Sequence, residues 1–227
     1  MTVVKTQDLT KDYAVNGITV NALRGVSLSF EAGEFAAVAG PSGSGKSTFL
    51  HLVGCLDMPT GGTVAVGGTD VSKLSRKDLA LLRRRSIGFI FQAYNLIPVL
   101  TSLENVSLPL VLLGRNPGEA RAEAEKALAE VGLGDMARRR PKEMSGGQQQ
   151  RVAIARALVK KPALILADEP TANLDSKTGR EVLELMLDLN RRESTTFLFS
   201  THDRMVMDYA RRLVELRDGR VETETLR

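Results

Sequence analysis

A glycine-rich segment carries the clearest chemical signal in this sequence. Residues 40–47 read GPSGSGKS and match the pattern G-x-x-x-x-G-K-[ST] at every fixed position. Glycines let several backbone N–H groups converge on one anion, and the positive end of the helix that follows points at the same place. In such a loop Lys46 reaches the β- and γ-phosphates of a nucleotide, and the Ser47 hydroxyl binds Mg²⁺. The segment predicts a site for Mg-ATP, formed by Gly40, Pro41, Ser42, Gly43, Ser44, Gly45, Lys46, Ser47 and Thr48.

The segments on either side of this phosphate loop (residues 40–47) support the prediction. Residues 35–39 form a short apolar run, which is typical of a strand buried on both faces. From Lys46 to about Leu56 the apolar residues recur at helical spacing. The alternative is a chance match in a Gly/Ser turn, but a chance match does not usually lie between a buried strand and an amphipathic helix.

Two adjacent acids, Asp168 and Glu169, follow another apolar run, residues 163–167. In an open α/β sheet, ligands bind at the carboxyl ends of the strands, where these acids are expected. Neighbouring carboxylates repel each other, so their position beside a buried strand favours a bound cation. We expect Asp168 to bind Mg²⁺ together with Ser47, and Glu169 to polarise the water that attacks the γ-phosphate. The alternative is a pair of surface acids that begin a loop.

A second segment has the features of an anion site. Ser145 and Gln148 have the spacing of a capping box, so a helix is expected to begin here and to run to about residue 159. Gly146 and Gly147 leave backbone N–H groups free at its N-terminus. Because the phosphate loop already binds the phosphates once, we expect this second site to bind the γ-phosphate of ATP held by another copy of the chain. ATP would then join two subunits head to tail, and hydrolysis would release them.

The order of elements along the chain indicates an α/β core with a helical insertion. The N-terminal region is expected to form strands around a turn at Asn16 and Gly17, and helices are expected at residues 119–131 and 182–189. A capping box at Thr101 is expected to open a helix through Leu108 that ends against Pro109. Residues 1–92 and 161–227 would form the core, and residues 93–160 a helical lobe. Further strands are expected at residues 63–66, 87–91, 163–167, 196–199 and 212–216.

The composition limits the classes of function. Among 227 residues, 43% are hydrophobic and 26% are charged, as in an ordinary globular protein. The net charge of +4 is low for a nucleic-acid binder, and 4% aromatic residues with no Trp do not suggest a base-stacking platform. We therefore expect no nucleic-acid partner. For the short basic clusters at residues 83–85 and 138–140, the first interpretation is a solvated surface, and the alternative is a patch that faces a partner or lipids.

The sequence also predicts a cytoplasmic location. It has no run of about 18 apolar residues that could span a bilayer and no stretch like a secretory signal. The single cysteine, Cys55, cannot form an internal disulfide, which fits a reducing compartment, and we expect it on a helix. A role at a membrane would therefore require a partner that spans the bilayer.

Several motifs, in a fixed order, resemble those of the ATP-binding-cassette (ABC) ATPases over nearly the whole chain. The segment MSGGQQQR, residues 144–151, resembles the family signature, with Met144 where Leu is more usual. Gln92 resembles the glutamine of the Q-loop, residues 173–175 (NLD) resemble the D-loop, and residues 200–203 (STHD) resemble the switch-histidine region. Tyr13 lies where the family stacks an aromatic ring on adenine. The resemblance implies an α/β fold: a P-loop NTPase core with an N-terminal antiparallel β region and an inserted α-helical lobe.

The resemblance also implies roles for these residues. Gln92 would contact Mg²⁺ or the attacking water and report its state to a transmembrane partner, and His202 would contact the γ-phosphate and hold Glu169 in line. Ser145, Gly146, Gly147 and Gln148 would act on the nucleotide of the opposite subunit, and Asp175 would connect the two sites. Taken singly, a glutamine after a strand is usually polar surface, a histidine is usually structural, and Tyr13 could be an ordinary strand aromatic.

Two classes of ABC protein remain open at this point. The first is the motor subunit of a membrane transporter, and the second is a cassette protein of cell division, DNA repair or translation. The chain has one cassette, no long heptad insertion and no cysteine cluster, which favours the transporter. The segments 54–62 and 94–106 resemble the lipoprotein-releasing and macrolide-exporting subfamily. Residues 138–144 lack a run found in the large fused exporters, so we expect a separate permease and a peripheral position on the cytoplasmic face of the inner membrane.

Overall fold

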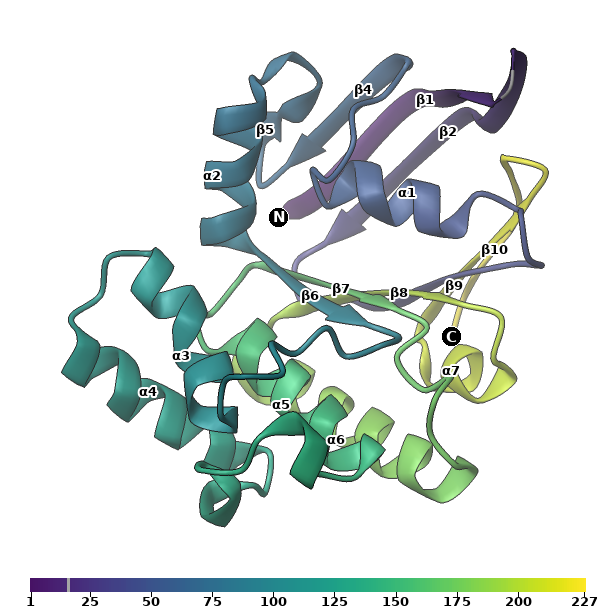
Figure 1. Ribbon diagram of the computed structural model, residues 1–227. Helices are drawn as coiled ribbons and strands as arrows, with labels where there is room; N and C mark the ends of the chain where they lie inside the picture. The colour runs from purple at the N-terminus through teal and green to yellow at the C-terminus, as the bar shows by residue number, and fades with distance from the viewer. Residues whose placement is uncertain (16) are drawn as a thin grey trace.

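A six-stranded sheet crosses the middle of the computed structural model, which describes residues 1–15 and 17–227 (Figure 1). Its five neighbouring strands β9, β3, β8, β7 and β6 are parallel, and β10 pairs antiparallel with β9 at one edge. Because the five strands are parallel, their carboxyl ends all lie at the same edge of the sheet. The strands are β3 (Phe35–Ala39), β6 (Ile87–Phe91), β7 (Leu164–Asp168), β8 (Thr196–Thr201), β9 (Arg212–Arg217) and β10 (Arg220–Leu226).

Both faces of this sheet are covered, so successive side chains of one strand enter different apolar cores. In β3, Ala36 and Val38 pack in one core, whereas Phe35, Ala37 and Ala39 pack in the other, and all five are fully buried. Burial on both faces is the condition under which a parallel strand is a continuous apolar run. The strand expected before the phosphate loop is therefore present.

A second, antiparallel sheet and one helix cover the first face. The sheet has the order β2-β1-β4-β5 and lies with α1 above the six-stranded sheet in Figure 1. This arrangement confirms the expected N-terminal antiparallel region. Gly17, at the turn between the first two strands, has a φ of +79°, and its predicted partner in the turn, Asn16, lies outside the described residues. The elements are β1 (Thr2–Val15), β2 (Ile18–Glu31), α1 (Lys46–Val53), β4 (Gly61–Val66), β5 (Thr69–Asp70), the 3-10 helix η1 (Val71–Lys73) and α2 (Arg76–Ser86).

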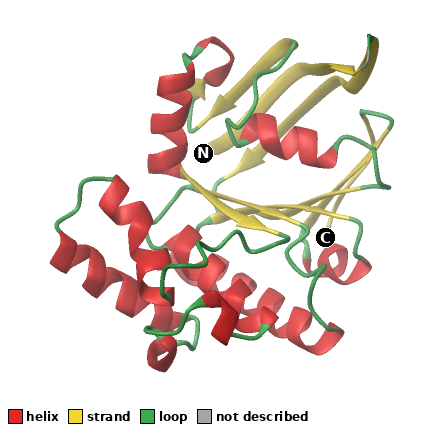
Figure 2. Ribbon diagram, in the orientation of Figure 1, coloured by secondary structure: helices red, strands yellow, loops and turns green. Residues whose placement is uncertain are grey.

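Helices cover the opposite face (Figure 2). Three of them, α3 (Ser102–Leu112), α4 (Pro117–Glu130) and α5 (Gly146–Leu158), lie in the chain between β6 and β7. This is the inserted α-helical lobe of the expected fold, although its limits at residues 93 and 160 stay a prediction. The other helices on this face are α6 (Ser176–Glu193) and α7 (Arg204–Tyr209), and the lobe also holds the 3-10 helices η2 (Gly134–Met136) and η3 (Pro141–Glu143).

The structure corrects several limits of the predicted elements. Helix α1 ends at Val53, before Leu56, because Gly54 caps it. Helix α3 does not stop at Pro109 but continues to Leu112. Proline removes the hydrogen bond that its own N–H would make and crowds the carbonyl one turn earlier, but the N–H of Leu113 still closes the last turn on the Pro109 carbonyl at 3.1 Å.

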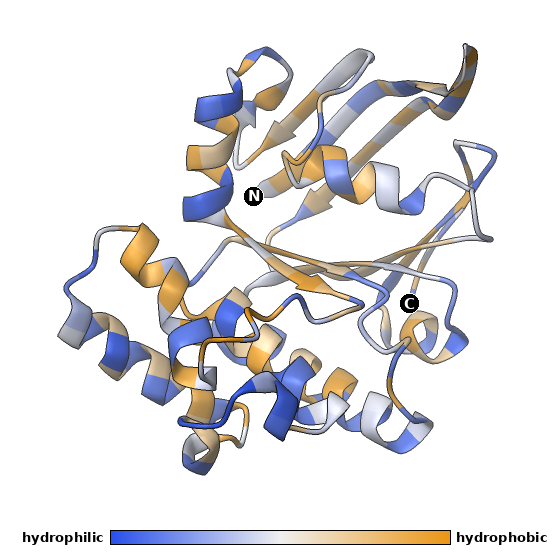
Figure 3. Ribbon diagram, viewed as in Figure 1, coloured by the Kyte–Doolittle hydropathy of each residue, from blue (hydrophilic) through white to orange (hydrophobic). Residues whose placement is uncertain are grey.

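Among the elements that the sequence did not predict, α2 and β10 lack a buried apolar stripe. In α2 only Leu79 is buried, and in β10 every residue is exposed. Figure 3 shows the contrast between buried and surface elements: hydrophobic residues line β6 and its neighbouring strands, whereas hydrophilic and hydrophobic residues are mixed on α4. Among the described helices, none combines the length and the apolar character needed to cross a bilayer.

The single cysteine provides a test of this packing. Cys55 is not on a helix but in the turn after α1, with a φ of +56° and 1% of its surface exposed. Burial raises the pKa of its thiol to about 11. Since only the thiolate reacts, its fraction at pH 8 is lower than that of a free cysteine by roughly two orders of magnitude. We expect the folded protein to react with a thiol-specific reagent far more slowly than the protein unfolded in guanidinium.

A control moves the thiol by one residue. In the double variant Cys55→Ala, Leu56→Cys the new cysteine replaces a side chain that is 45% exposed, so it should react rapidly in the folded protein. Equal reaction rates for the folded wild type and this variant would show that Cys55 is not buried.

Candidate nucleotide-binding site

The phosphate loop lies between the carboxyl end of β3 and the N-terminus of α1. The ammonium group of Lys46 lies inside the loop, where its Nζ donates to the carbonyl oxygens of Gly40 at 2.8 Å and of Pro41 at 2.9 Å. Glycine is required at two positions because other backbone segments pass close by. A Cβ added to Gly40 would lie 2.2 Å from the Leu216 carbonyl oxygen, and one added to Gly45 would lie 2.6 Å from that of Ala22.

The polar groups of the loop suit a bound phosphate. The Ser44 hydroxyl oxygen is buried and has no hydrogen-bond partner, although buried polar atoms are nearly always paired. Helix α1 begins at Lys46, and its N-cap residue Gly45 offers no side-chain cap, so the N–H groups of the first turn are free of intrahelical partners. An anion at this helix end would accept hydrogen bonds from these groups and meet the positive end of the helix dipole.

Oxygen atoms suited to Mg²⁺ gather beside the loop. The hydroxyl of Ser47 donates to Asp168 Oδ1 at 3.3 Å, and the hydroxyl of Ser200, on β8, donates to the same oxygen at 2.5 Å. In the described part of the chain no three His, Cys, Asp or Glu side chains form a metal cluster. Proteins often bind Mg²⁺ through one or two carboxylates while phosphates and water supply the remaining ligands, and Asp168 with the Ser47 hydroxyl offers such a set.

The carboxylate of Glu169 has a different set of partners from that of Asp168. Oε1 lies 2.6 Å from His202 Nδ1 and accepts a hydrogen bond from the His202 N–H at 3.1 Å, and Oε2 accepts one from the Thr201 hydroxyl at 3.2 Å. Glu169 has a φ of +45°, a left-handed conformation that is uncommon for residues other than glycine. The backbone N–H of Glu169 donates to the Ser200 carbonyl at 3.0 Å, so residues of β8 hold both the backbone and the carboxylate of Glu169.

The carboxylate of Glu169 thus lies beside the imidazole of His202, which is the more exposed of the two side chains. The side chain of Glu169 is 15% exposed and that of His202 is 68% exposed. A carboxylate fixed by hydrogen bonds can orient a water molecule and accept its proton. The roles of Ser200 and Thr201, unlike that of His202, are not predicted by the sequence, because only the pairing of β7 with β8 brings these hydroxyls to the acids.

Gln92 lies at the same edge of the sheet. It follows β6, whose last residue, Phe91, pairs with Asp168. The Gln92 residue is exposed, and its carbonyl accepts a hydrogen bond from Asn173 Nδ2 at 3.0 Å. The structure thus brings the carboxyl ends of β3, β6, β7 and β8, and with them Lys46, Gln92 and both acids, to one side of the sheet.

Tyr13 is held by the segment after α1. Its hydroxyl donates to Asp57 Oδ2 at 2.9 Å, and the ammonium of Lys11 lies 4.8 Å from the centre of its ring and 2.8 Å from Asp57. Burial raises the pKa of Tyr13, the Asp57 carboxylate raises it further, and the Thr48 hydroxyl opposes the increase. Tyr13 therefore lies beside the first turn of α1.

The second anion segment forms a separate cluster with the D-loop segment. Ser145 caps α5: its hydroxyl accepts from the Gln148 N–H at 3.3 Å, and Gln148 Oε1 accepts from the Ser145 N–H at 2.9 Å. Asp175 caps α6 in the same way, by accepting from the N–H groups of Lys177 and Thr178. The two helix ends are close, since a Cβ added to Gly147 would lie 2.4 Å from Thr178 Cγ2. Within one chain, each of these capping bonds joins a cap residue to the first turn of its own helix.

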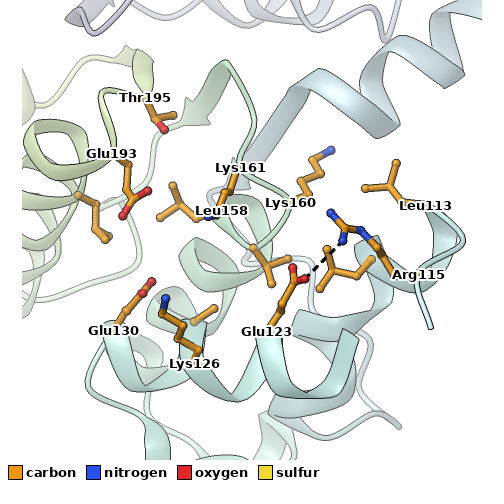
Figure 4. A pocket seen from close by; sticks show the side chains of 14 residues that line it. Leu113, Arg115, Glu123, Lys126, Glu130, Leu158, Lys160, Lys161, Glu193 and Thr195 are labelled. Carbon is orange, nitrogen blue, oxygen red and sulfur yellow. Dashed lines mark ion pairs between the residues drawn. The ribbon is translucent and has the colours of Figure 1, made fainter. Parts of the chain in front are cut away.

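A well-formed cavity in the described structure lies away from the phosphate loop. It has a volume of about 400 Å³, and its lining comes from α3 to α6 and the loops after them, with no residue of the phosphate loop. Figure 4 shows charged side chains around it, including the Arg115–Glu123 ion pair at 3.6 Å. Charges of both signs meet there, so the cavity does not select an obvious ligand.

Comparison with known proteins shows close similarity over the whole chain. Residues 23–172 match the ABC transporter family. A lipoprotein-releasing system ATP-binding protein, LolD of Anaeromyxobacter dehalogenans, is 49% identical over 96% of this chain and 92% of its own length. A macrolide export ATP-binding/permease protein, MacB of Marinobacter nauticus, is 47% identical over 98% of this chain, which spans only 34% of that relative.

A solved structure is similar throughout. The ATP-binding cassette MJ0796, in a dimeric post-hydrolysis state bound to ADP and Pi, has a TM-score of 0.90 and 44% identity, with 98% of both chains covered.

Substituting Gly40 by alanine should disrupt the phosphate loop. The φ of Gly40 is +145°, a conformation almost confined to glycine, and the added Cβ would press on the Leu216 carbonyl. We expect a loss of about 2–3 kcal/mol in the free energy of unfolding, measured with urea, and loss of ATP binding, measured by titration.

Gly67→Ala is the matched control. Gly67 has a φ of +56°, but nothing lies within 4 Å of an added Cβ. This variant should lose only about 1 kcal/mol and bind ATP normally. If the two variants were equally stable and bound ATP equally, the close approach at Gly40 would not matter for the site.

Proposed function

The chain belongs to the ABC transporter family as an ATP-binding and ATP-hydrolysing subunit, and on that premise we propose that it is the motor of a lipoprotein-release or macrolide-export type of transporter. The observation that carries the catalytic part of this proposal is the pairing of Asp168 with Ser47 and of Glu169 with His202 at one edge of the sheet. The names of the relatives, a lipoprotein-releasing protein and a macrolide exporter, support the type of transporter.

The proposed chemistry assigns each group of the site one task. The phosphate loop and Lys46 would bind the phosphates through N–H groups and one positive charge. Ser47 and Asp168, with Gln92 near them, would hold Mg²⁺, which when bound offsets the negative charge of the phosphates. Glu169 would orient the attacking water and accept its proton, while His202 and Thr201 keep the carboxylate in position. Tyr13 would stack on the adenine ring.

We propose that the working form is a head-to-tail dimer with ATP at the interface. The phosphate loop and the Ser145–Gln148 end of α5 each have the character of an anion site, yet no hydrogen bond described here joins them within one chain. The dimeric state of the similar cassette MJ0796, with ADP and Pi bound, supports this assembly. In it, residues 145–148 of one subunit would close over the nucleotide of the other, and Asp175 would lie between the two sites.

The region beside Gln92 is the proposed docking surface for a membrane-spanning permease. Ile97 and Val99, which follow Gln92 in the chain, are 37% and 74% exposed. A small cavity of about 200 Å³ lies next to this segment, lined by residues such as Phe89, Phe91 and Pro109. An apolar helix of a permease would bury these side chains, which would hold the subunit on the cytoplasmic face of the membrane.

Replacing Glu169 tests the catalytic proposal. Glu169→Gln keeps the size of the side chain but removes the carboxylate that accepts a proton, so ATP affinity should stay near that of the wild type and turnover should fall by about 10²-fold or more. The variant should accumulate as an ATP-bound dimer in gel filtration. Glu125→Gln, a change at an exposed ion pair on α4, is the control and should hydrolyse ATP normally. Normal turnover by Glu169→Gln would refute the assignment.

Mixed subunits test the composite site. Ser145→Arg blocks one anion site and Lys46→Ala weakens the other, so each variant alone should be inactive as a dimer. In a mixture, one site of each heterodimer combines an intact Lys46 with an intact Ser145, and about a quarter of the wild-type sites should be restored. ATPase activity of the mixture no higher than that of its components would contradict action across the interface.

A further inference from the structure

Two consecutive residues after Gln92 adopt a conformation that requires support. Tyr94 has a φ of +60° and Asn95 a φ of +49°, both in the left-handed region. Single residues other than glycine visit this region at a cost, and two in succession persist only where the surroundings hold them. The segment 92–95 is therefore set by contacts rather than by its own preference.

Arg156 supplies these contacts from α5. Its Nη2 donates to the carbonyl of Tyr94 at 2.7 Å, and its Nη1 donates to the carbonyl of Asn95 at 2.5 Å. Burial lowers the pKa of Arg156, but a guanidinium remains charged in proteins, so both bonds are charge-assisted. The planar fork of an arginine binds two adjacent carbonyls through two separate nitrogens in a fixed geometry, whereas a lysine would have to bind both through a single nitrogen.

The segment held in this way contacts both the α5 N-terminus and the D-loop segment. The Tyr94 hydroxyl lies 3.4 Å from the Asn173 carbonyl oxygen, and a Cβ added to Gly146 would lie 2.8 Å from the same hydroxyl. Asn173 in turn donates to the Gln92 carbonyl at 3.0 Å. Tyr94 therefore lies between Gly146, in the second anion site, and Asn173, in the D-loop segment.

Helix α5 is the rigid element common to these contacts. It carries Ser145 at its N-terminal cap and Arg156 near its C-terminus. Its backbone lies close to β6, because a Cβ added to Gly88 would be 2.8 Å from the Ala157 carbonyl oxygen. Gln150, fully buried on the same helix, donates to the carbonyl of Pro170, the residue after Glu169, at 2.6 Å.

We propose that Arg156 is a positioning residue that fixes the Gln92–Asn95 segment to α5, so that Gln92 and Ser145 keep one relative position. The inference rests on the proposed function, in which Gln92 serves the nucleotide of its own subunit and Ser145 that of the opposite one. Through Arg156, a displacement of Gln92 at one nucleotide would also displace Ser145, which the same subunit presents to the other nucleotide. It touches neither nucleotide.

The test compares Arg156→Ala with Arg151→Ala. Arg151 lies on the same helix and donates to the Val131 carbonyl at 3.2 Å, but it has no described contact with the segment after Gln92. In the nucleotide-free protein, Arg156→Ala should speed amide hydrogen exchange at Tyr94, Asn95 and Ile97 by about tenfold or more, as expected for loss of charge-assisted bonds. ATP affinity of the monomer should be unchanged, whereas kcat should fall by about tenfold or more.

Dimer formation and a conservative variant complete the experiment. In the Glu169→Gln background, Arg156→Ala should reduce the ATP-bound dimer seen in gel filtration, and Arg151→Ala should not. Arg156→Lys keeps the charge and most of the volume but not the fork, so its exchange rates and kcat should lie between those of the wild type and Arg156→Ala. If Arg156→Ala does not fold, Arg156→Lys alone carries the comparison.

Equal exchange rates, kcat and dimer formation for the Arg156 and Arg151 variants would overturn the inference. It would also be overturned if ATP affinity of the monomer fell together with kcat, since that would indicate a general structural defect. A wild-type protein that fails to hydrolyse ATP would instead refute the proposed function, while the exchange measurement without nucleotide would still test the hold of Arg156 on the segment.

Discussion

The parallel alignment of β3, β8, β7 and β6 is the constraint on which the rest of the site depends. Its register pairs Ala39 with Thr201, Ser200 with Asp168, and Asp168 with Phe91. These pairs bring the phosphate loop, the two acids, His202 and Gln92 to a single edge. A parallel sheet is stable only when both faces are covered, so the antiparallel sheet with α1 on one side and the helices on the other are requirements of the same arrangement.

Three residues at or just beyond this edge have unfavourable backbone conformations. Glu169, Tyr94 and Asn95 all have positive φ values, and each such residue costs about 1–2 kcal/mol relative to an ordinary conformation. Hydrogen bonds offset that cost in every case: β8 holds the N–H and the carboxylate of Glu169, and Arg156 holds the carbonyls of the other two. The left-handed conformation of Glu169 occurs where the carboxylates of Asp168 and Glu169 have different partners: Asp168 accepts from Ser200, and Glu169 accepts from Thr201.

Helix α5 connects these features to the second anion site. One end of the helix presents Ser145, Gly146 and Gly147, and the other end holds the segment after Gln92. In the proposed dimer the two ends of this helix serve different nucleotides. In this proposed dimer each subunit would supply half of two ATP sites, so association of the subunits and completion of the sites would be one event.

The sequence by itself determined the features that depend on neighbouring residues. The phosphate loop, the buried run before it, the acids after residues 163–167 and the capping boxes at Thr101 and Ser145 are all local patterns, and the structure contains the elements that they predict. Only the tertiary structure decided that Ser200 bonds to Asp168, that Thr201 bonds to Glu169, and that Arg156 bonds to Tyr94. It also decided that α3 continues through Pro109 and that the polar α2 and the exposed β10 form at all. The physical reason is that these features depend on which strands and helices lie side by side, and residues 32 to 62 positions apart reveal their proximity only when the chain has folded.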